Sequence, residues 1–589
     1  MKRLATVAVL TMLATLVPAG LARADHVPTE LGPHVGLTAD QPVLKHGPVR
    51  FVTNLPVARG VAAPLGDHDK AVFTRDGRRY MAISSTVYGL HVLDVTNPLA
   101  PVAVSDYASA AGCPSALAEY LAAHSPALAK NPFAVFNIAI DGALGLTGWE
   151  NDVSVTPDGT IAVIGMDAGG RCHDPDYGGL EFVDLTDLKR PRTLHLTRNV
   201  GLAHSVGIDP AKPWLAYIST SDGSDFIDIV DFRSCLGGVA QIDRCRPTVA
   251  RADFSTKTPG IPRNPDDPSR DLVAEGCHDT RFRAGRLYCA ALDATIIFDI
   301  SGVVGAGGEL TGTHLDCPLD SAGVLARGVM ATDCSAWTKS KFTADNARSV
   351  TIEAVSTILH DGSKPPTEDI SIAHQAEAIE DGKVMLVTDE RGGGLGVGPR
   401  RACPDGGIWF YDIRNESKPL LMKTPDGNSA VFRTDKFQQT FASCTAHYGT
   451  QVPGERLLTF AWYTGGSHLV RYDIDYSKSP AEITFEEVAT YIPSGAWTTQ
   501  NMPMGRNPAN PDELIVYAAD ATRGLDVLAF NVPRAGDASD DTGAKVLGNQ
   551  FNRRVLATTG VADTTALGLI LVFAAAAVAR RARTRTSRP

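Results

Sequence analysis

The sequence contains an internal repeat of two β-rich runs, and this repeat constrains the fold more than any other feature. Each pair has a short first run, a polar or Gly-containing turn, and an apolar second run that usually ends in aspartate. Seven such pairs occur along the 589 residues. The second runs read GLHVLDVTNP, GLEFVDLTDL, FIDIVDF, TIIFDIS, GIWFYDI, LVRYDID and GLDVLAF, and the first runs read RRYMAIS, GTIAVIG, PWLAYIS, GRLYCAA, GKVMLVT, ERLLTFA and DELIVYA. Because the runs are short and rich in Val, Ile, Leu, Tyr and Phe, we predict strands rather than buried helices.

Seven small sheets that cannot each bury both faces are expected to stack around a common axis. The sequence therefore predicts an all-β fold, a seven-bladed β-propeller over residues 49–533 with insertions between the blades. Residues 113–130 are interpreted as an inserted amphipathic helix, and residues 310–366 as the longest insertion. The β-like run at 49–57 has no neighbouring partner, so we expect it to supply the closing outer strand of the last blade.

The aspartate that ends the second run is interpreted as structural. A short carboxylate at a strand end accepts backbone N–H groups and fixes the turn that follows. The seventh repeat has Ala529 in this place, and the other six have Asp94, Asp184, Asp231, Asp299, Asp412 and Asp473.

Several of these segments carry a resemblance to a known family. DVTNPLAP, DLTDLKRP and DIRNESKP resemble the LVIVD repeat, and a longer set of motifs over residues 277–530 (CHDTRF, AHQAEAI, VTDERGGG, GIWFYDI, CTAHYG, AWYTGG and RGLDVL) is similar to the LVIVD-repeat surface proteins of Gram-positive bacteria. The resemblance implies a β-propeller outside the cell. It implies no reaction for particular residues.

The N-terminus predicts export. Basic residues 2–3, an apolar run at 4–21 and a small-x-small site at 22–24 are typical of a secretory signal peptide, which we assign to residues 1–24. Residues 25–48 are then an N-terminal arm of the mature chain.

Export makes disulfides the expected state of the 10 cysteines. Proximity along the chain suggests two pairs, Cys235–Cys245 and Cys277–Cys289. Chain order alone suggests the other three, Cys113–Cys172, Cys317–Cys334 and Cys403–Cys444.

The C-terminus predicts attachment to the cell envelope. Residues 534–555 are interpreted as a flexible tether, and 556–589 as a sorting signal with an apolar helix at 566–579 and a basic tail at 580–589. The motif at its start resembles the LAxTG variant that class E sortases cut, here between Thr559 and Gly560. It consists of Leu556, Ala557, Thr558, Thr559 and Gly560. A plain membrane tail anchor is the alternative, so the expected partners are the bacterial membrane, the cell wall and a sortase.

Charge excludes one class of partner. The formal net charge is −11, and the most concentrated basic cluster lies in the C-terminal tail. Because phosphate binding needs a basic face, we do not expect a nucleic-acid partner.

A histidine stands just before the first strand in most repeats. Equivalent residues at the inner strands of a propeller are expected to surround one mouth of the channel, which makes them the candidate binding residues. They are His68, His204, His278, His374 and His447, with Asn151 in the second repeat and Trp497-Thr498 in the seventh. Neutral imidazole is a favoured ligand of Cu, Fe and Zn, and His204, His278, His374 and His447 are the candidate metal ligands. The alternative is that the blade needs a histidine there to bridge neighbouring backbones.

Two weaker candidates have simpler explanations. The charged residues 389–391 before a Gly-rich turn are candidates for lining a pocket, with solvated or mutually paired charges as the favoured interpretation. The aromatic residues Trp462, Tyr463 and Trp497 are interpreted as core packing or a sugar-binding surface.

These observations favour a cell-surface propeller that binds an unknown extracellular ligand. The alternative is a metal-dependent extracellular enzyme, an oxidase or lyase, that uses the ring of channel histidines. A surface protein for adhesion or stress protection, without a small-molecule site, is a third alternative.

Overall fold

The structure is a computed structural model, and it describes residues 42–55, 67–85, 89–108, 149–168, 179–197, 200, 203–219, 226–253, 258–263, 276–314, 347–365, 367–391, 404–437, 444–493, 496, 498–520 and 524–534. Several predictions fall outside these residues: the signal peptide, the helix at 113–130, the tether beyond Arg534 and the sorting signal with its apolar helix. Among the described residues, no helix has the length and apolar character needed to cross a membrane.

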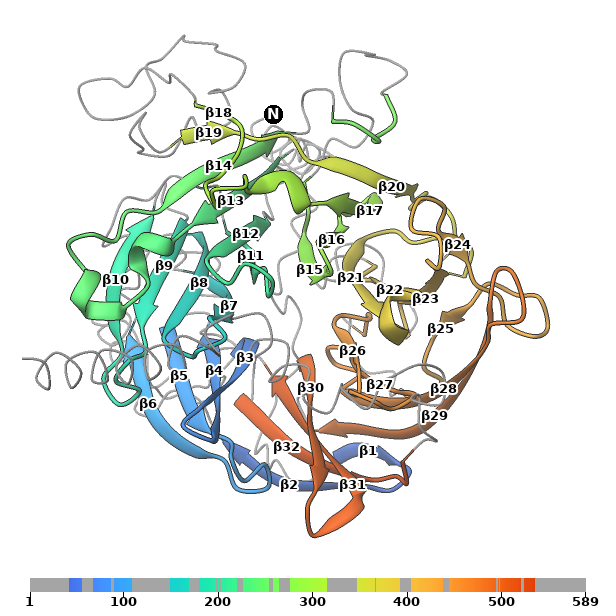
Figure 1. Ribbon diagram of the computed structural model, residues 1–589. Coiled ribbons are helices and arrows are strands. Elements are labelled where there is room, and N and C mark those ends of the chain that lie inside the picture. Colours follow the sequence, from blue (N-terminus) through green and yellow to red (C-terminus); the bar gives the residue numbers. More distant parts are fainter. Residues whose placement is uncertain are drawn as a thin grey trace, which may run out of the picture.

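The described strands form seven mainly antiparallel sheets, arranged as the blades of a β-propeller (Figure 1). Among the described residues, the helical segments are the short 3-10 turns η2 (Arg233–Cys235), η3 (Gly238–Gln241), η4 (Ser301–Val303) and η7 (Glu380–Gly382). The first three blades are built from β3 (Asp67–Arg75), β4 (Arg78–Ser85), β5 (Gly89–Asp94) and β6 (Val102–Ala108); β7 (Trp149–Val155), β8 (Ile161–Ala168), β9 (Gly179–Asp184) and β10 (Arg192–Thr197); and β11 (Ser205–Ile208), β12 (Leu215–Ser219), β13 (Phe226–Asp231) and β14 (Thr248–Asp253). The fourth and fifth are built from β15 (Asp279–Arg283), β16 (Arg286–Ala290), β17 (Ala294–Asp299) and β20 (Glu353–Leu359); and β21 (Ala373–Ile379), β22 (Val384–Asp389), β23 (Gly407–Asp412), β24 (Leu420–Leu421) and β25 (Val431–Phe432). The last two are built from β26 (Gly449–Gln451), β27 (Leu457–Ala461), β28 (Ser467–Asp475) and β29 (Glu482–Pro493); and β30 (Thr498–Asn507), β31 (Asn510–Asp520) and β32 (Gly524–Asn531).

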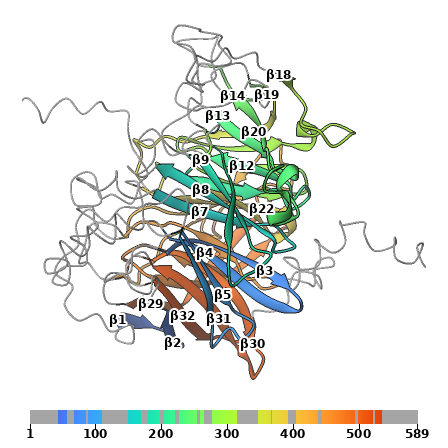
Figure 2. The same cartoon turned by 90° about the vertical axis from the view of Figure 1, so that its left-hand side faces the viewer.

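The innermost strands contact one another in chain order, and β30 of the seventh blade contacts β3 of the first. The side view agrees, with β3 next to β30 and β31 (Figure 2). The prediction of a closed seven-bladed β-propeller is therefore confirmed, and the repeated runs of the sequence are the second and third strands of each blade.

The turns after the third strands explain most of the repeated aspartates. Each carboxylate accepts the backbone N–H of the residue two positions later, at 2.8–3.2 Å, in Asp94, Asp184, Asp231, Asp299 and Asp412. The sixth repeat corrects the prediction, because there Asp475 accepts the N–H of Ser477 at 2.9 Å. Asp473, two residues earlier on β28, forms an exposed ion pair with Arg456 instead.

The N-terminal residues lie on the outside of the last two blades. β2 (Val49–Leu55) pairs antiparallel with β32, so the seventh blade is completed by the start of the chain. The ion pair Arg50–Glu513, with an N–O distance of 2.7 Å, joins β2 to β31. The sequence did not indicate β1 (Pro42–His46), which pairs antiparallel with β29 and adds a fifth strand to the sixth blade. The arm assigned to residues 25–48 thus ends within the propeller.

The longest insertion differs from the expectation. In chain order, residues 300–352 separate the third strand β17 of the fourth blade from its outer strand β20, so the insertion interrupts one blade instead of joining two. Part of this segment returns to the third blade, where β19 (Ala347–Ser349) pairs parallel with β14 and β18 (Thr313–His314) pairs with β19. The sequence placed β20 inside the insertion because this outer strand is partly exposed and lacks the apolar pattern of the second and third strands.

The core lies between the faces of neighbouring blades, where the second and third strands are almost entirely buried. Two predicted disulfides are confirmed, Cys235–Cys245 and Cys277–Cys289. Cys444 is also disulfide-bonded, and its expected partner Cys403 lies outside the described residues. The cysteines of the other two predicted pairs lie outside them as well.

Candidate functional site

The pairing of the inner strand is irregular where this strand begins, with register shifts in the first, second, fifth and seventh blades. In the fifth blade Ala373 pairs with Asp389 and Gln375 with Thr388, which leaves His374 as the extra residue. In the fourth blade the N–H of His278 donates to the carbonyl oxygen of Ala290 at 2.6 Å, although the register partner of Ala290 is the next residue, Asp279. A bulge turns a side chain away from the regular pleat and is common beside functional sites. In the blades that have it, the bulge gives a structural reason why the residue at this position can present its side chain to the channel.

The residues at this position are those singled out in the sequence, with one correction. His204, His278, His374 and His447 come from the third to sixth blades and all lie at or just before the inner strands. In the seventh blade the bulge falls at Thr499, because Thr498 pairs with Asp520 and Gln500 with Ala519. His68 lies in β3 and Asn151 in β7, and their side chains are outside the described part of the structure.

The four described histidines form one row of touching rings. Their side chains are buried, and none of the four residues is more than 3% exposed. The ring centroids are 4.5 Å apart for His204 and His278, 4.6 Å for His278 and His374, and 4.2 Å for His374 and His447. Two imidazoles on adjacent corners of one metal, with bonds of about 2.1 Å, place their ring centres roughly 4.6 Å apart at a right angle and roughly 5.3 Å apart at the tetrahedral angle. The spacing of the row lies at or slightly below the lower end of this range, so the rings are close enough to share an ion after small side-chain movements.

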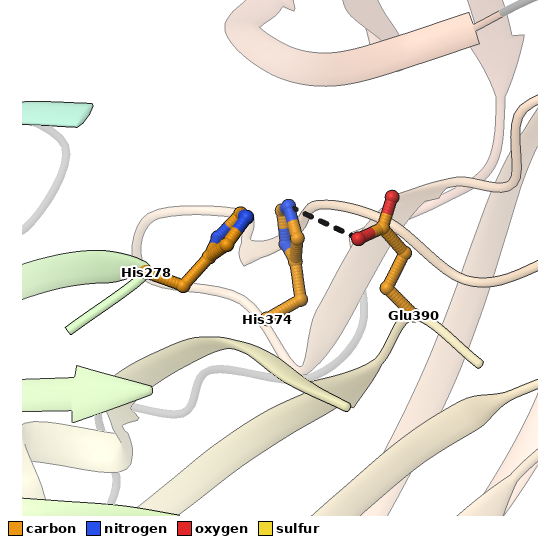
Figure 3. Close-up of side chains that lie close together, drawn as sticks. All are labelled: His278, His374 and Glu390. Carbon is orange, nitrogen blue, oxygen red and sulfur yellow. Dashed lines mark ion pairs between the residues drawn. The ribbon is translucent and has the colours of Figure 1, made fainter. Parts of the chain in front are cut away.

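A carboxylate completes this group, as Figure 3 shows. One ligand atom from each of His278, His374 and Glu390 lies within 4.8 Å of the other two, and all three residues are buried. The closest approach between ring and carboxylate is 3.9 Å, from His374 Nε2 to Glu390 Oε2. A metal with bonds near 2.1 Å holds its ligand atoms roughly 3–4 Å apart, so small side-chain movements bring all three groups to one ion.

Glu390 is held in place by the backbone around it. It follows the end of β22, and its N–H donates to the carbonyl oxygen of Ile372 at 3.0 Å. The preceding carboxylate, Asp389, accepts the N–H groups of Ser371 at 3.1 Å and Ile372 at 3.0 Å. These bonds fasten the segment leading to His374 against the end of β22. Burial raises the pKa of Asp389 to about 6.

A glycine packs closely against the same end of β22. Gly406 has a φ of +64°, and a Cβ atom there would lie 2.0 Å from the carbonyl oxygen of Asp389. Only glycine therefore allows the chain to pass so close to the residue that precedes Glu390.

His278 and His447 are fixed by different means. Cys277, next to His278, is joined to Cys289 on β16, so a disulfide anchors this histidine to the second strand of its blade. His447 Nδ1 donates to the backbone carbonyl of Thr499 in the next blade. That bond places the imidazole lone pair on Nε2, the arrangement usual for a metal-binding histidine.

Tyr463, two residues after the end of β27 in the sixth blade, also contacts this cluster. Its hydroxyl donates to Glu390 Oε1, and its ring lies 4.5 Å from the ring of His447. Burial raises the pKa of Tyr463 well above its ordinary value, so the phenol keeps its proton at neutral pH.

The residues that follow the bulge tie neighbouring blades together. Asp152 accepts the N–H of Val206 at 2.7 Å, and Ser205 donates to Asp279 at 3.0 Å. Gln375 forms two bonds of 2.8 Å with the backbone of Gly449. The position after the histidine thus forms bonds to a neighbouring blade in the second, third and fifth blades. The structural alternative for the histidines has support in the bond from His447 to the backbone of Thr499 in the next blade.

A second polar layer lies beside the histidines on the inner strands. Arg281 forms an ion pair with Asp279 at 3.3 Å and lies over the ring of Tyr448, which itself contacts His374 and His447. Glu377 accepts hydrogen bonds from Gln375 and Thr450, and burial raises its pKa to about 7.

The sequence did not identify two members of the cluster. For Glu390 the favoured interpretation was a solvated or paired charge and the alternative a pocket residue; it is completely buried beside His374. Tyr463 was assigned to core packing or a sugar surface, whereas its neighbour Trp462 does pack in the core of the fifth and sixth blades. The only available signal was the position of Glu390 directly after a strand whose blade carries His374.

Neither a family model nor a curated protein matches this chain. Solved structures match at the level of fold. A putative 6-phosphogluconolactonase from Bacteroides uniformis has a TM-score of 0.38 and 12% identity, over 76% of this chain and 95% of that chain. The periplasmic gluconolactonase of Pseudomonas aeruginosa gives 0.38 and 10%, over 80% and 96%. The β-propeller domain of Cps50 (Swd1) from Myceliophteria thermophila gives 0.41 and 10%, over 82% and 99%. Scores this low carry no functional argument, and the chain is defined by its own topology as a seven-bladed β-propeller protein.

Proposed function

We propose that this chain is an exported, envelope-attached β-propeller that acts as a binding module and holds a divalent transition metal in its channel. The proposed ligands are His278, His374 and Glu390, with His204 and His447 next in the same row. One observation carries the proposal: buried imidazoles from consecutive blades converge with a buried carboxylate, and one ligand atom from each of the three residues lies within 4.8 Å of the other two.

The chemistry of the donor set favours a metal over other ligands. Imidazole nitrogens suit Zn, Cu, Fe and Ni, and two histidines with one carboxylate form a common site for such ions. Buried carboxylates are costly unless a positive charge or hydrogen bonds compensate them. A divalent cation among neutral imidazoles would supply that positive charge next to Glu390.

Metal binding is tested with cobalt, whose visible absorption reports its ligands. The purified full chain is expected to bind one Co²⁺ in the channel, and His374→Ala and Glu390→Ala are expected to lose it. His195→Ala is the matched control, because this partly buried histidine lies on the outer strand β10, away from the cluster. Equal Co²⁺ binding by the wild-type chain and His374→Ala would contradict the proposal.

The proposed location rests on the two ends of the sequence. Residues 1–24 have the pattern of a signal peptide, and residues 556–589 have that of a sorting signal or tail anchor. Mass spectrometry of envelope fractions tests both: a chain that ends at Thr559 with wall fragments indicates a sortase, and an intact arginine tail indicates a membrane anchor. A cytosolic chain that retains residues 1–24 would contradict the proposed export.

A metal-dependent extracellular enzyme is the second candidate function. In the described residues, three groups lie close enough to share one ion, whereas a closed structural site has four. This number favours the enzyme. Catalytic sites keep a position for substrate or water. Azide added to the Co²⁺ form is expected to change its visible spectrum if such a position exists, and an unchanged spectrum would favour a binding module without turnover.

A further inference from the structure

The backbone at Tyr463 has an unusual conformation beside the candidate metal site. Its φ is +43°, in the left-handed region that aromatic residues rarely adopt. Two backbone hydrogen bonds to Thr498 in the seventh blade, of 3.0 and 3.1 Å, hold this conformation. The N–H of Gly466 also donates to the carbonyl oxygen of Tyr463. Strained residues of this kind cluster at functional sites when the surrounding structure fixes them.

This conformation directs Tyr463 toward two members of the cluster. The hydroxyl donates to Glu390 Oε1, and the ring packs 4.5 Å from His447 with an angle of 35° between the planes. The other oxygen of the same carboxylate, Oε2, is the one that approaches His374 Nε2, at 3.9 Å. The phenol thus occupies one oxygen of Glu390 and leaves the second directed at the histidines.

Tyr463 also belongs to the support of His447. The Tyr463–Thr498 backbone pair precedes Thr499, whose carbonyl accepts the Nδ1 proton of His447. One short segment of the sixth blade therefore fixes the carboxylate from the fifth blade and the imidazole of its own blade.

We propose that Tyr463 is the positioning residue of this site, holding Glu390 so that it binds the metal through Oε2 alone. The inference rests on the metal site proposed above. Hydrogen-bonding partners of metal ligands fix ligand orientation, and their loss typically weakens metal binding 10- to 100-fold. A bound ion would then see two imidazoles and a single carboxylate oxygen, which keeps coordination positions open for a further ligand.

The test compares Tyr463→Phe with Tyr517→Phe in the full chain. Each change removes one buried phenolic hydroxyl. Tyr517 lies on β31 of the seventh blade, and its hydroxyl donates to the carbonyl oxygen of Pro98 at 2.8 Å. Tyr463→Phe is expected to raise the Co²⁺ dissociation constant 10- to 100-fold and to change the intensity of the visible Co²⁺ bands. Tyr517→Phe is expected to keep the wild-type constant and spectrum.

The outcomes separate this inference from the function on which it rests. If Glu390→Gln weakens Co²⁺ binding while Tyr463→Phe leaves the constant and the spectrum unchanged, the positioning role is overturned and the metal site stands. If the wild-type chain binds no Co²⁺, both fail. A Tyr463→Phe protein that loses Co²⁺ only in proportion to a loss of folded protein, measured by far-UV circular dichroism, also overturns the positioning role.

Discussion

The ion pair between Asp228 and Arg251 offers a strong test of what holds a blade together. The two residues lie opposite each other on β13 and β14, and their side chains are 0% and 3% exposed. Two parallel hydrogen bonds of 2.6 and 2.7 Å join the guanidinium to the carboxylate. The guanidinium also lies 3.5 Å above the ring of Phe226. The charge of Arg251 is thus balanced deep inside the third blade.

Removing one partner is expected to cost far more than removing both. Asp228→Leu leaves the buried guanidinium without this carboxylate, which should lower the free energy of unfolding by about 3–5 kcal/mol. The double change Asp228→Leu with Arg251→Met replaces the pair by apolar groups of similar size. Because such replacements are often close to neutral, the double variant should recover most of the lost stability.

Urea denaturation followed by far-UV circular dichroism measures these differences. Asp473→Leu is the control, since Asp473 forms an ion pair with Arg456 but its side chain is 74% exposed. This variant should unfold like the wild type, because exposed ion pairs contribute little. A double variant that is as unstable as Asp228→Leu would refute the argument from uncompensated charge.

Three further predictions concern the channel and its supports. Burial raises the pKa of Glu377 from 4.5 to about 7, so the folded state retains a proton that the unfolded chain releases. The free energy of unfolding should therefore fall as the pH rises from about 4.5 through about 7, by up to about 3 kcal/mol, and urea titrations of Glu377→Gln should show this slope removed. Replacing Cys277 and Cys289 by alanine removes a disulfide between residues 12 apart in sequence, which should lower the free energy of unfolding by about 3 kcal/mol. The same change should weaken Co²⁺ binding. Unchanged Co²⁺ affinity would show that the disulfide does not position His278. Gly406→Ala should lower the thermal midpoint and Co²⁺ affinity together, because its Cβ displaces the strand end before Glu390; a wild-type melting curve would contradict this.

The strands that the sequence predicted are those with the strongest physical signal. The second and third strands of each blade are buried on both faces, so they appear as continuous apolar runs, and the aspartate turns mark where the third strands end. The outer strands are half exposed and carry a weaker pattern. For this reason β1 was missed and β20 was assigned to an insertion.

The candidate site was predictable only in part, because its members come from different local environments. The histidines share one place in the repeat, so the sequence brought His204, His278, His374 and His447 into one hypothesis. Their contacts depend on the bulges and on the radius of the ring, which no local pattern specifies. Glu390 and Tyr463 reach the cluster from the ends of second strands, where the sequence has no repeated residue. By comparison with the other repeats, the sequence indicated Trp497-Thr498 as the equivalent position in the seventh blade. The bulge lies at Thr499 instead, between the paired residues Thr498 and Gln500.

The central claim is that the channel histidines and Glu390 hold one metal ion. Anomalous diffraction at the cobalt edge from crystals of the Co²⁺-loaded full chain tests it most directly. The account predicts one strong peak in the channel, within about 2.1 Å of nitrogens of His278 and His374 and of Oε2 of Glu390. A map whose cobalt peaks lie only at exposed carboxylates, with none among these three residues, would contradict it.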